Sequence, residues 1–147
     1  ISGVHLQFLW PLHKQIMKAS EASYHDTNDT SLVTKITYGD RSFLLTGDIS
    51  ERVEALLIDS GQNLKSDLLF MPHHGSNHSS SLEFIGAVCP QYAIVSSGKN
   101  NVFRHPHPAV LERYRSHHVR LYRTDQQGAI SVQTDGKSLN IVPWLKQ

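Results

Sequence analysis

Cysteine is nearly absent from this sequence, because Cys89 is the only one among 147 residues. A single cysteine excludes an internal disulfide bond and any zinc site built from several thiolates. Cys89 follows an apolar helical pattern and precedes Pro90, so we predict that it is a small buried core residue.

Long apolar runs are absent as well. No run approaches the roughly 20 residues that cross a bilayer, and residues 1–20 lack the cationic head and apolar block of a signal peptide. The composition is that of an ordinary globular protein, with 39% hydrophobic and 18% charged residues. The length fits one domain, residues 1–147. Since the sequence starts at Ile1, directly before a predicted strand, we expect it to be a piece of a longer protein.

The net charge is only +1, but the two signs are unevenly distributed. Residues 1–97 hold six Lys or Arg and ten Asp or Glu, whereas residues 98–147 hold eight and three. A basic final third beside an acidic middle suits a polyanionic partner, with a metal ion held by the acidic part. Ordinary solvated surface charge explains the same asymmetry.

Apolar patterns predict an α/β (α+β) fold. Alternating or continuous apolar residues predict strands at 4–10, 31–38, 42–46, 68–71, 92–95, 119–123, 128–133 and 139–142. In the first of these strands, Val4, Leu6, Phe8 and Trp10 are expected to share one apolar face. Helices are predicted after Ser50, after one of the serines at 79–81, and from Pro108. Residues 13–30 are predicted to form a loop, with His13 and His25 at the surface.

Residues 67–80 are the strongest candidate for a functional site, because a histidine-rich loop follows a short strand that is predicted to be buried. Pro72 ends the strand, and His73, His74, Gly75 and Ser76 come next. Loops at the carboxyl ends of strands are where α/β proteins build their sites. Neutral imidazole binds first-row metals, and hydroxyl and backbone N–H groups suit phosphate.

Polar residues follow two other predicted strands, so we expect one edge of the sheet to carry Asp48, His73 or His74, and Ser97 with His105. A carboxylate bridging two metal ions, with imidazole beside it, would suit a zinc or manganese site. Alternatively, Asp48 caps the helix that follows it. The remaining histidines of these regions are predicted to be surface or loop residues: His78, His107, His117 and His118.

Five ordered blocks of the sequence resemble the C-terminal hydrolase domain of ComEC-type DNA-uptake proteins, namely residues 28–33, 43–48, 67–76, 105–107 and 123–130. That domain is similar to metallo-β-lactamase-fold hydrolases. The resemblance implies an αββα sandwich with a two-metal site at one edge. It implies Asp48 as the bridging ligand, His74 as a second ligand, and His73 near the substrate phosphate. His105 matches the histidine of the family's His-Pro element.

Three further groups are predicted to bind the substrate. The hydroxyls of Ser76 and Ser97 and the guanidinium of Arg104, which precedes His105, would contact phosphate oxygens.

The first metal motif of that fold, His-x-His-x-Asp-His, is absent from the sequence. The chain is therefore expected to be a single partial domain, the C-terminal part of the sandwich, with at most three metal ligands. We expect it to bind metal weakly or not at all, and to show no efficient catalysis alone. An uncovered sheet face or edge would favour self-association.

The resemblance implies that the parent domain is a metal-dependent phosphodiesterase or nuclease, using zinc or manganese, that acts on DNA during uptake. It would be a soluble domain of a bacterial inner-membrane protein that has transmembrane segments elsewhere. One alternative is a non-catalytic module that guides single-stranded DNA by charge. Its candidate residues are Arg104, Arg113, Arg115, Arg120 and Arg123. Another is a hydrolase of a small phosphorylated or acyl substrate, because fold does not fix substrate.

Overall fold

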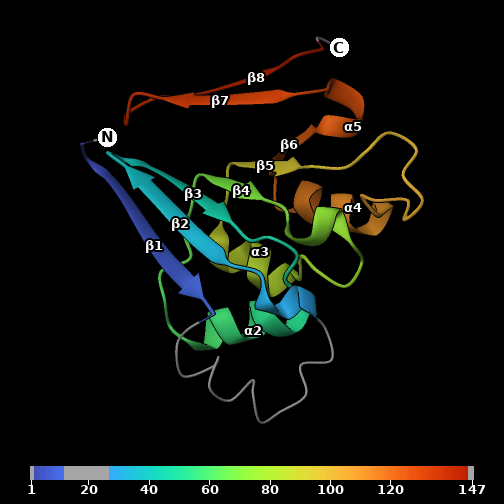
Figure 1. Cartoon of the computed structure of the whole chain (residues 1–147), viewed down its shortest axis with the longest axis horizontal. Helices are drawn as coiled ribbons and strands as arrows, with labels where there is room; N and C mark the ends of the chain where they lie inside the picture. Colours follow the sequence, from blue (N-terminus) through green and yellow to red (C-terminus); the bar gives the residue numbers. More distant parts are fainter. Residues whose placement is uncertain (1, 12–26, 146–147) are drawn as a thin grey trace.

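Six strands form one sheet in which the order in space is the order in the sequence (Figure 1). The structure, a computed structural model, describes residues 2–11 and 27–145. The sheet contains β1 (Val4–Trp10), β2 (Val33–Tyr38), β3 (Arg41–Leu45), β4 (Leu68–Phe70), β5 (Tyr92–Val95) and β6 (Arg120–Arg123). A separate hairpin contains β7 (Ile130–Thr134) and β8 (Leu139–Pro143). The helices are η1 (Thr27–Thr30), α2 (Glu51–Asp59), η2 (Pro72–Gly75), α3 (Leu82–Val88), α4 (Pro108–Ser116) and α5 (Thr124–Gln127).

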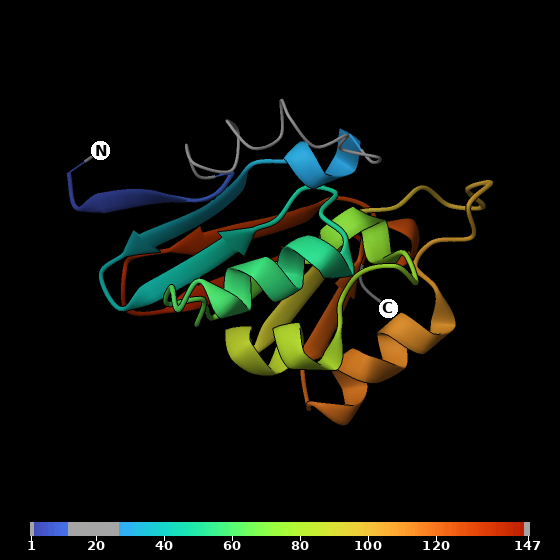
Figure 2. The same ribbon diagram turned by 90° about the horizontal axis from the view of Figure 1, so that it is seen from below.

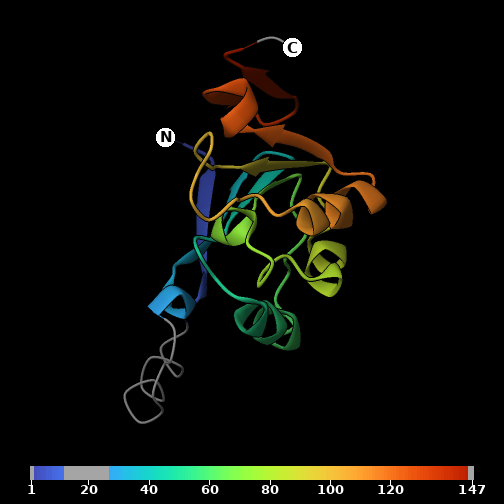
Figure 3. The same cartoon turned by 90° about the vertical axis from the view of Figure 1, so that its right-hand side faces the viewer.

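The sheet separates two layers. Helices α2, α3 and α4 cover one face, and the β7–β8 hairpin lies on the opposite face (Figures 2 and 3). The predicted α+β class is confirmed. The two histidines predicted to lie on a surface loop, His13 and His25, fall outside the described residues.

Strand direction follows from the connections. The tight turn at Gly39 joins β2 and β3 as an antiparallel hairpin. Strands β3 to β6 are parallel, since a helix crosses over between each pair. The predicted helix starts are also confirmed. Ser50 is the N-cap residue of α2, Ser81 caps α3 by accepting from the N–H of Phe84, and Pro108 opens α4.

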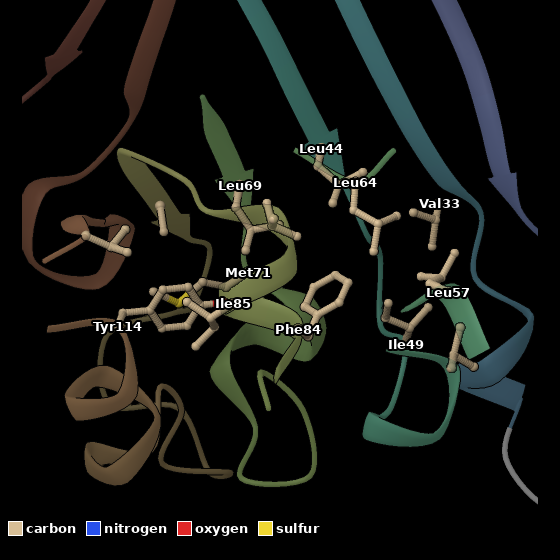
Figure 4. Packing of buried hydrophobic residues seen from close by; sticks show 14 of the residues in the cluster. Val33, Leu44, Ile49, Leu57, Leu64, Leu69, Met71, Phe84, Ile85 and Tyr114 are labelled. Atoms are coloured by element: carbon tan, nitrogen blue, oxygen red, sulfur yellow. The ribbon is translucent and has the colours of Figure 1, made fainter. Parts of the chain in front are cut away.

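Two hydrophobic clusters hold the layers together. The larger lies between the sheet and the helices, where Leu44 and Leu69 of the strands meet Phe84, Ile85 and Tyr114 (Figure 4). The smaller lies between the sheet and the hairpin, and it is formed by Leu68, Ile94 and Tyr122 with apolar residues of β7 and β8. Burial on both faces explains why β4 and β5 read as continuous apolar runs.

The prediction of one shared apolar face along the first strand is wrong. The pairing of β1 with β2 shifts register between Phe8 and Trp10, and such a bulge breaks the alternation of side chains. As a result Leu9 and Trp10 are both buried, while Leu6 and Phe8 are 59% and 58% exposed.

The prediction of a buried Cys89 is also wrong, because the residue is exposed. Cys89 is the C-cap of α3 and takes a left-handed conformation, with φ of 48°. This conformation turns the chain out of the helix, so the side chain leaves the apolar face that Val88 still occupies.

Among the described residues, none of the helices is long and apolar enough to cross a membrane.

Candidate functional site

Three loops meet at the carboxyl edge of the sheet, as predicted. They follow the parallel strands β3, β4 and β5, and parallel strands end at the same edge. Backbone hydrogen bonds join them. The N–H of His73 donates to the carbonyl of Gly47 over 3.0 Å, and the N–H of His107 donates to the carbonyl of Gly75 over 2.9 Å. In Figure 2, η2 lies beside the loop that follows β5.

The histidine loop has an unusual backbone. His73, His74 and Gly75 have φ values of 48°, 55° and 78°, so three consecutive residues are left-handed. This turns the two imidazoles away from the buried strand and toward the loop after β5. Such a conformation costs free energy in residues with a side chain and is typical of functional sites.

Asp48 and His74 converge at this edge. The Nε2 atom of His74 lies 3.4 Å from Oδ1 of Asp48, and both side chains are about half exposed, at 52% and 40%. The backbone of Asp48 is fixed, since its N–H donates to the hydroxyl of Ser31 over 3.0 Å. Ser50 rather than Asp48 is the N-cap residue of α2. The alternative in which Asp48 caps that helix is therefore wrong.

Nε2 of His74 faces Asp48, and the hydrogen bond made by Nδ1 on the other side of the ring fixes the tautomer. Nδ1 lies 2.7 Å from the carbonyl oxygen of Ser96. A carbonyl only accepts, so Nδ1 carries the proton, and Nε2 of the neutral ring has a free lone pair. A lone pair and a carboxylate at 3.4 Å need a cation between them, either a proton on His74 or a metal ion.

The donor pair fits a metal ion in part. Ligand atoms about 2.1 Å from a tetrahedral zinc ion lie roughly 3.4 Å apart, which is the separation of these two atoms. A backbone carbonyl behind the imidazole is the usual outer support of a metal-bound histidine. Within the described ranges, no group of three His, Cys, Asp or Glu side chains could hold a metal ion. Among the residues that the structure describes, the site thus offers a pair of candidate metal donors and not a complete set.

His73 and His105 form the next part of the site. Their rings meet edge to face, with 5.9 Å between centroids and 80° between planes. Nε2 of His73 lies 3.4 Å from Nδ2 of Asn28. Burial lowers the pKa of His105 below its usual 6.5, and repulsion from the imidazoles of His73, His74 and His107 lowers it further. His105 is therefore neutral at pH 7 and can donate or accept one hydrogen bond at each ring nitrogen.

An open pocket of about 310 Å³ lies beside His74. Its lining combines small polar residues with two rings, and consists of His74, Ser96, Ser97, Gly98, Asn101, Phe103 and His105. The hydroxyl of Ser97 is buried and has no hydrogen-bond partner in the described part of the chain. Buried polar groups are nearly always paired, and a rotation of this side chain toward the pocket would give the hydroxyl a partner in a bound ligand.

The three predicted substrate-binding residues occupy different settings. Ser97 lines the pocket, and Arg104 is exposed beside His105. Ser76 lies inside the histidine loop, only 4% exposed, where its hydroxyl accepts from the N–H of His78 over 3.3 Å. Its position suits holding the loop in shape rather than contacting a substrate.

Two asparagines were not predicted as part of the site. Asn28 contacts His73, as described above. Asn101 brackets His105, since its side chain donates to the carbonyl of that residue over 2.6 Å and accepts from its N–H over 3.0 Å. The one signal in the sequence was the short spacing: Asn101 follows Gly98 and lies four residues before His105, close enough for a side chain to close the loop.

The arginines proposed for a charge-guided DNA track are largely engaged in contacts within the protein. Arg113 donates to the carbonyls of Ser79 and Ser80 and pairs with a glutamate of α2. Arg123 forms a two-pronged ion pair with Asp125, whereas Arg115 pairs with Glu112. Arg120 lies over the ring of Tyr122. Of the five, Arg104 is the one whose neighbours in the sequence, Phe103 and His105, line the pocket.

The comparison with protein families found no matching family model. The chain is 42% identical over 129 residues to Competence protein ComA of Neisseria gonorrhoeae, a match that covers 87% of this chain and 18% of that protein. It is 43% identical over 103 residues to ComE operon protein 3 of Bacillus subtilis, covering 70% and 13%. Recombination protein 2 of Haemophilus influenzae is 33% identical over 130 residues, covering 88% and 15%. The chain spans less than a fifth of the length of these curated relatives.

Proposed function

We propose that this relative of bacterial competence proteins forms part of a metal-dependent phosphodiesterase or nuclease site that acts on DNA during uptake. In this proposal the chain belongs to a metallo-β-lactamase-like domain of a larger inner-membrane protein. The names of two relatives, a competence protein and a competence operon protein, support the link to DNA uptake.

One observation carries the catalytic part of the proposal. Asp48 Oδ1 and His74 Nε2 face each other at 3.4 Å, while the other ring nitrogen of His74 is held by the carbonyl of Ser96. These two donors, with further ligands from outside the chain, would hold zinc or manganese. A divalent ion held there would polarise a phosphodiester and lower the pKa of bound water.

The residues of this chain would act on the substrate as follows. His74 is oriented by its Nδ1–H bond to Ser96, so the lone pair of the neutral ring is at Nε2, which faces Asp48. Neutral His105, fixed by Asn101, donates a ring N–H to a phosphate oxygen. The hydroxyl of Ser97 has no partner among the described residues, and after rotation toward the pocket it would form one hydrogen bond with the substrate. The ring of His73 packs edge to face against His105 on the same side of the site.

The test is nuclease activity on a single-stranded oligonucleotide in Mn²⁺ or Zn²⁺, with the chain extended on its N-terminal side to match its relatives. We expect Asp48→Asn and His74→Asn each to lower kcat by about 100-fold or more, because each replaces a carboxylate or imidazole donor with a weaker amide oxygen. Asparagine is chosen because it tolerates the left-handed conformation of His74 better than alanine does.

His118→Asn is the matched control for His74→Asn. His118 is also exposed and left-handed, with φ of 58°, and it stands at the end of α4. It should leave activity unchanged. Full activity in both Asp48→Asn and His74→Asn would show that the site has been assigned to the wrong residues.

The 147-residue chain alone should bind Zn²⁺ or Mn²⁺ weakly, because two ligands do not hold an ion tightly. A metal-content measurement on the purified chain checks this. A stoichiometric, tightly bound ion that survives dialysis would contradict the expected partial site.

A further inference from the structure

Phe103 stands at the open side of the candidate site. It is 76% exposed, and its neighbour Val102 is 87% exposed. A single exposed apolar side chain is ordinary on a protein surface. Phe103 differs from Val102 because its ring is part of the wall of the 310 Å³ pocket, whereas Val102 is not among the lining residues.

The ring of Phe103 continues a row of aromatic side chains. It stacks on His105, with 5.8 Å between centroids and 26° between planes. His105 in turn meets His73 edge to face. The row therefore runs from the outer loop to the histidines of the site, and the outer face of Phe103 remains open to solvent.

The loop is held so that this ring keeps its position. Asn101 donates to the carbonyls of Gly98 and His105, at 2.9 Å and 2.6 Å, and so ties both ends of the loop together. Asn100 and Arg104 are left-handed, with φ of 57° and 56°, which turns the segment between them outward. An aromatic ring fixed before binding loses little conformational entropy when a ligand arrives.

The pocket thus offers two kinds of recognition side by side. Its inner part has the hydroxyl of Ser97 and the imidazoles of His74 and His105, which suit a phosphate. Its outer part is a flat aromatic face, with the cation of Arg104 next in the chain. A nucleotide unit of a single strand likewise carries a phosphate next to an unpaired base.

We propose that Phe103 is a stacking platform for an unpaired base of single-stranded DNA, next to the backbone phosphate held at the site. This inference rests on the proposed function for the identity of the phosphate. In a duplex both faces of each base are covered by its neighbours, so the platform favours a single strand or a flipped base.

The direct test is the binding of a single-stranded oligonucleotide that contains one 2-aminopurine, measured by fluorescence quenching in EDTA so that no cleavage occurs. Base–aromatic stacking is worth roughly a factor of 5 to 150 in affinity per base. We expect Phe103→Ala to weaken binding and quenching by about 10-fold, within that range, and Phe103→Trp to retain both.

Two controls separate stacking from a general loss of structure. Val102→Ala, one residue away and outside the pocket, should bind like the unaltered chain. A strand of the same length that is abasic at every position should bind the unaltered chain and Phe103→Ala equally. If Phe103→Ala binds the base-containing strand as tightly as the unaltered chain, or if no variant binds either strand, the inference is overturned.

The nuclease assay distinguishes this inference from the proposed function. Phe103→Ala should raise KM by about 10-fold and change kcat little, because stacking acts in the ground state as well as in the transition state. Loss of activity in Asp48→Asn together with an unchanged KM in Phe103→Ala would support the nuclease proposal and contradict the role of Phe103 in stacking. Base-dependent binding without any hydrolysis would support the role of Phe103 in stacking and contradict the nuclease proposal.

Discussion

At the scale of single residues, Gly75 sets how closely two loops of the site approach. A Cβ atom at this position would lie 2.6 Å from Cβ of Pro106, and the φ of Gly75 is 78°. Its carbonyl also accepts from the N–H of His107. The residue therefore has no room for a side chain and a backbone conformation that disfavours one.

We predict that Gly75→Ala lowers the free energy of unfolding by about 2–4 kcal/mol, the sum of left-handed strain and overpacking. The same substitution should push His105 away from the histidine loop and reduce activity. Urea denaturation measures the first effect, and the nuclease assay measures the second.

Gly86→Ala is the matched control. Gly86 lies in α3, and a Cβ atom there would meet nothing within 4 Å. Alanine is the better helix former by about 0.8–1.0 kcal/mol, so this variant should be at least as stable as the unaltered chain. Equal stability of the two variants would contradict the steric account of Gly75.

The two candidate metal donors could be predicted from the sequence, but the contacts that orient them could not. Asp48 and His74 stand after buried strands and carry metal-ligand side chains, so their convergence could be predicted from sequence. The tautomer of His74 depends on a carbonyl 22 residues away, that of Ser96. No local pattern encodes such a contact, and the same is true of the bulge that separates Phe8 from Trp10.

At the scale of elements, side chains of α2 and α4 form hydrogen bonds with the segment that leads into α3. Glu54 of α2 is fully buried, and its carboxylate accepts from the N–H of Ser80 and from both the N–H and the hydroxyl of Ser81. Tyr114 of α4 lies 3.0 Å from the hydroxyl of Ser80. The carboxylate therefore joins α2 to the loop that follows the histidines.

Burial raises the pKa of Glu54 above its usual 4.5, although the hydrogen bonds from Ser81 partly oppose this shift. The folded state therefore binds this proton more readily than the unfolded state does. By linkage, the stabilising contribution of Glu54 is largest below the unfolded pKa and falls as the pH rises through the raised folded value.

We predict that Glu54→Gln lowers the free energy of unfolding by about 1–3 kcal/mol at neutral pH, because an amide nitrogen would face the donors of Ser81. The glutamine does not titrate, so the difference from the unaltered chain should be larger at about pH 5 than at pH 7. Urea denaturation at both pH values checks the magnitude and the sign.

Glu51→Gln is the control from the first turn of the same helix. Glu51 is half exposed, and its ion pair with Arg113 lies at the surface. A surface pair of this kind contributes about 0–1 kcal/mol, so the variant should be close to neutral. A difference between Glu54→Gln and the unaltered chain that shrinks toward low pH would contradict the raised pKa.

The strands and the longer helices were predictable from apolar patterns, and the single-turn helices were not. The eight predicted strands correspond to the eight observed, with ends that differ by one or two residues. By contrast η1, η2 and α5 have four residues each. A single turn has no period to detect, and tertiary contacts such as the hydrogen bonds between Thr124 and Ser97 hold α5 in place.

At the scale of the whole molecule, the hairpin covers only part of its face of the sheet. The cluster beneath it is formed by residues of β3 to β6 with β7 and β8. Leu6 and Phe8 of β1 are not part of this cluster and remain more than half exposed. Strand β1 is also an edge of the described sheet, and an apolar edge strand favours association with other chains.

We predict that the chain self-associates through this region and that Leu6→Lys with Phe8→Lys shifts it toward the monomer. The stability should change by less than about 1 kcal/mol, because both side chains are already exposed. Sedimentation velocity at several protein concentrations measures the association.

Gln7→Lys adds the same type of charge to the same strand, at an exposed position between Leu6 and Phe8 whose side chain points to the other face. It should leave association nearly unchanged. Association that persists in the double variant, or that disappears equally in Gln7→Lys, would show that the apolar face is not responsible.

The sequential order of the six strands has a consequence for how the protein is made. As the ribosome releases the nascent polypeptide, each strand from β2 onward emerges next to a partner that has already been synthesised. Vectorial assembly can therefore proceed without waiting for remote segments, which shortens the exposure of unpaired strands to aggregation. The loop with His105 emerges after those with Asp48 and His74, so the pocket closes late in translation.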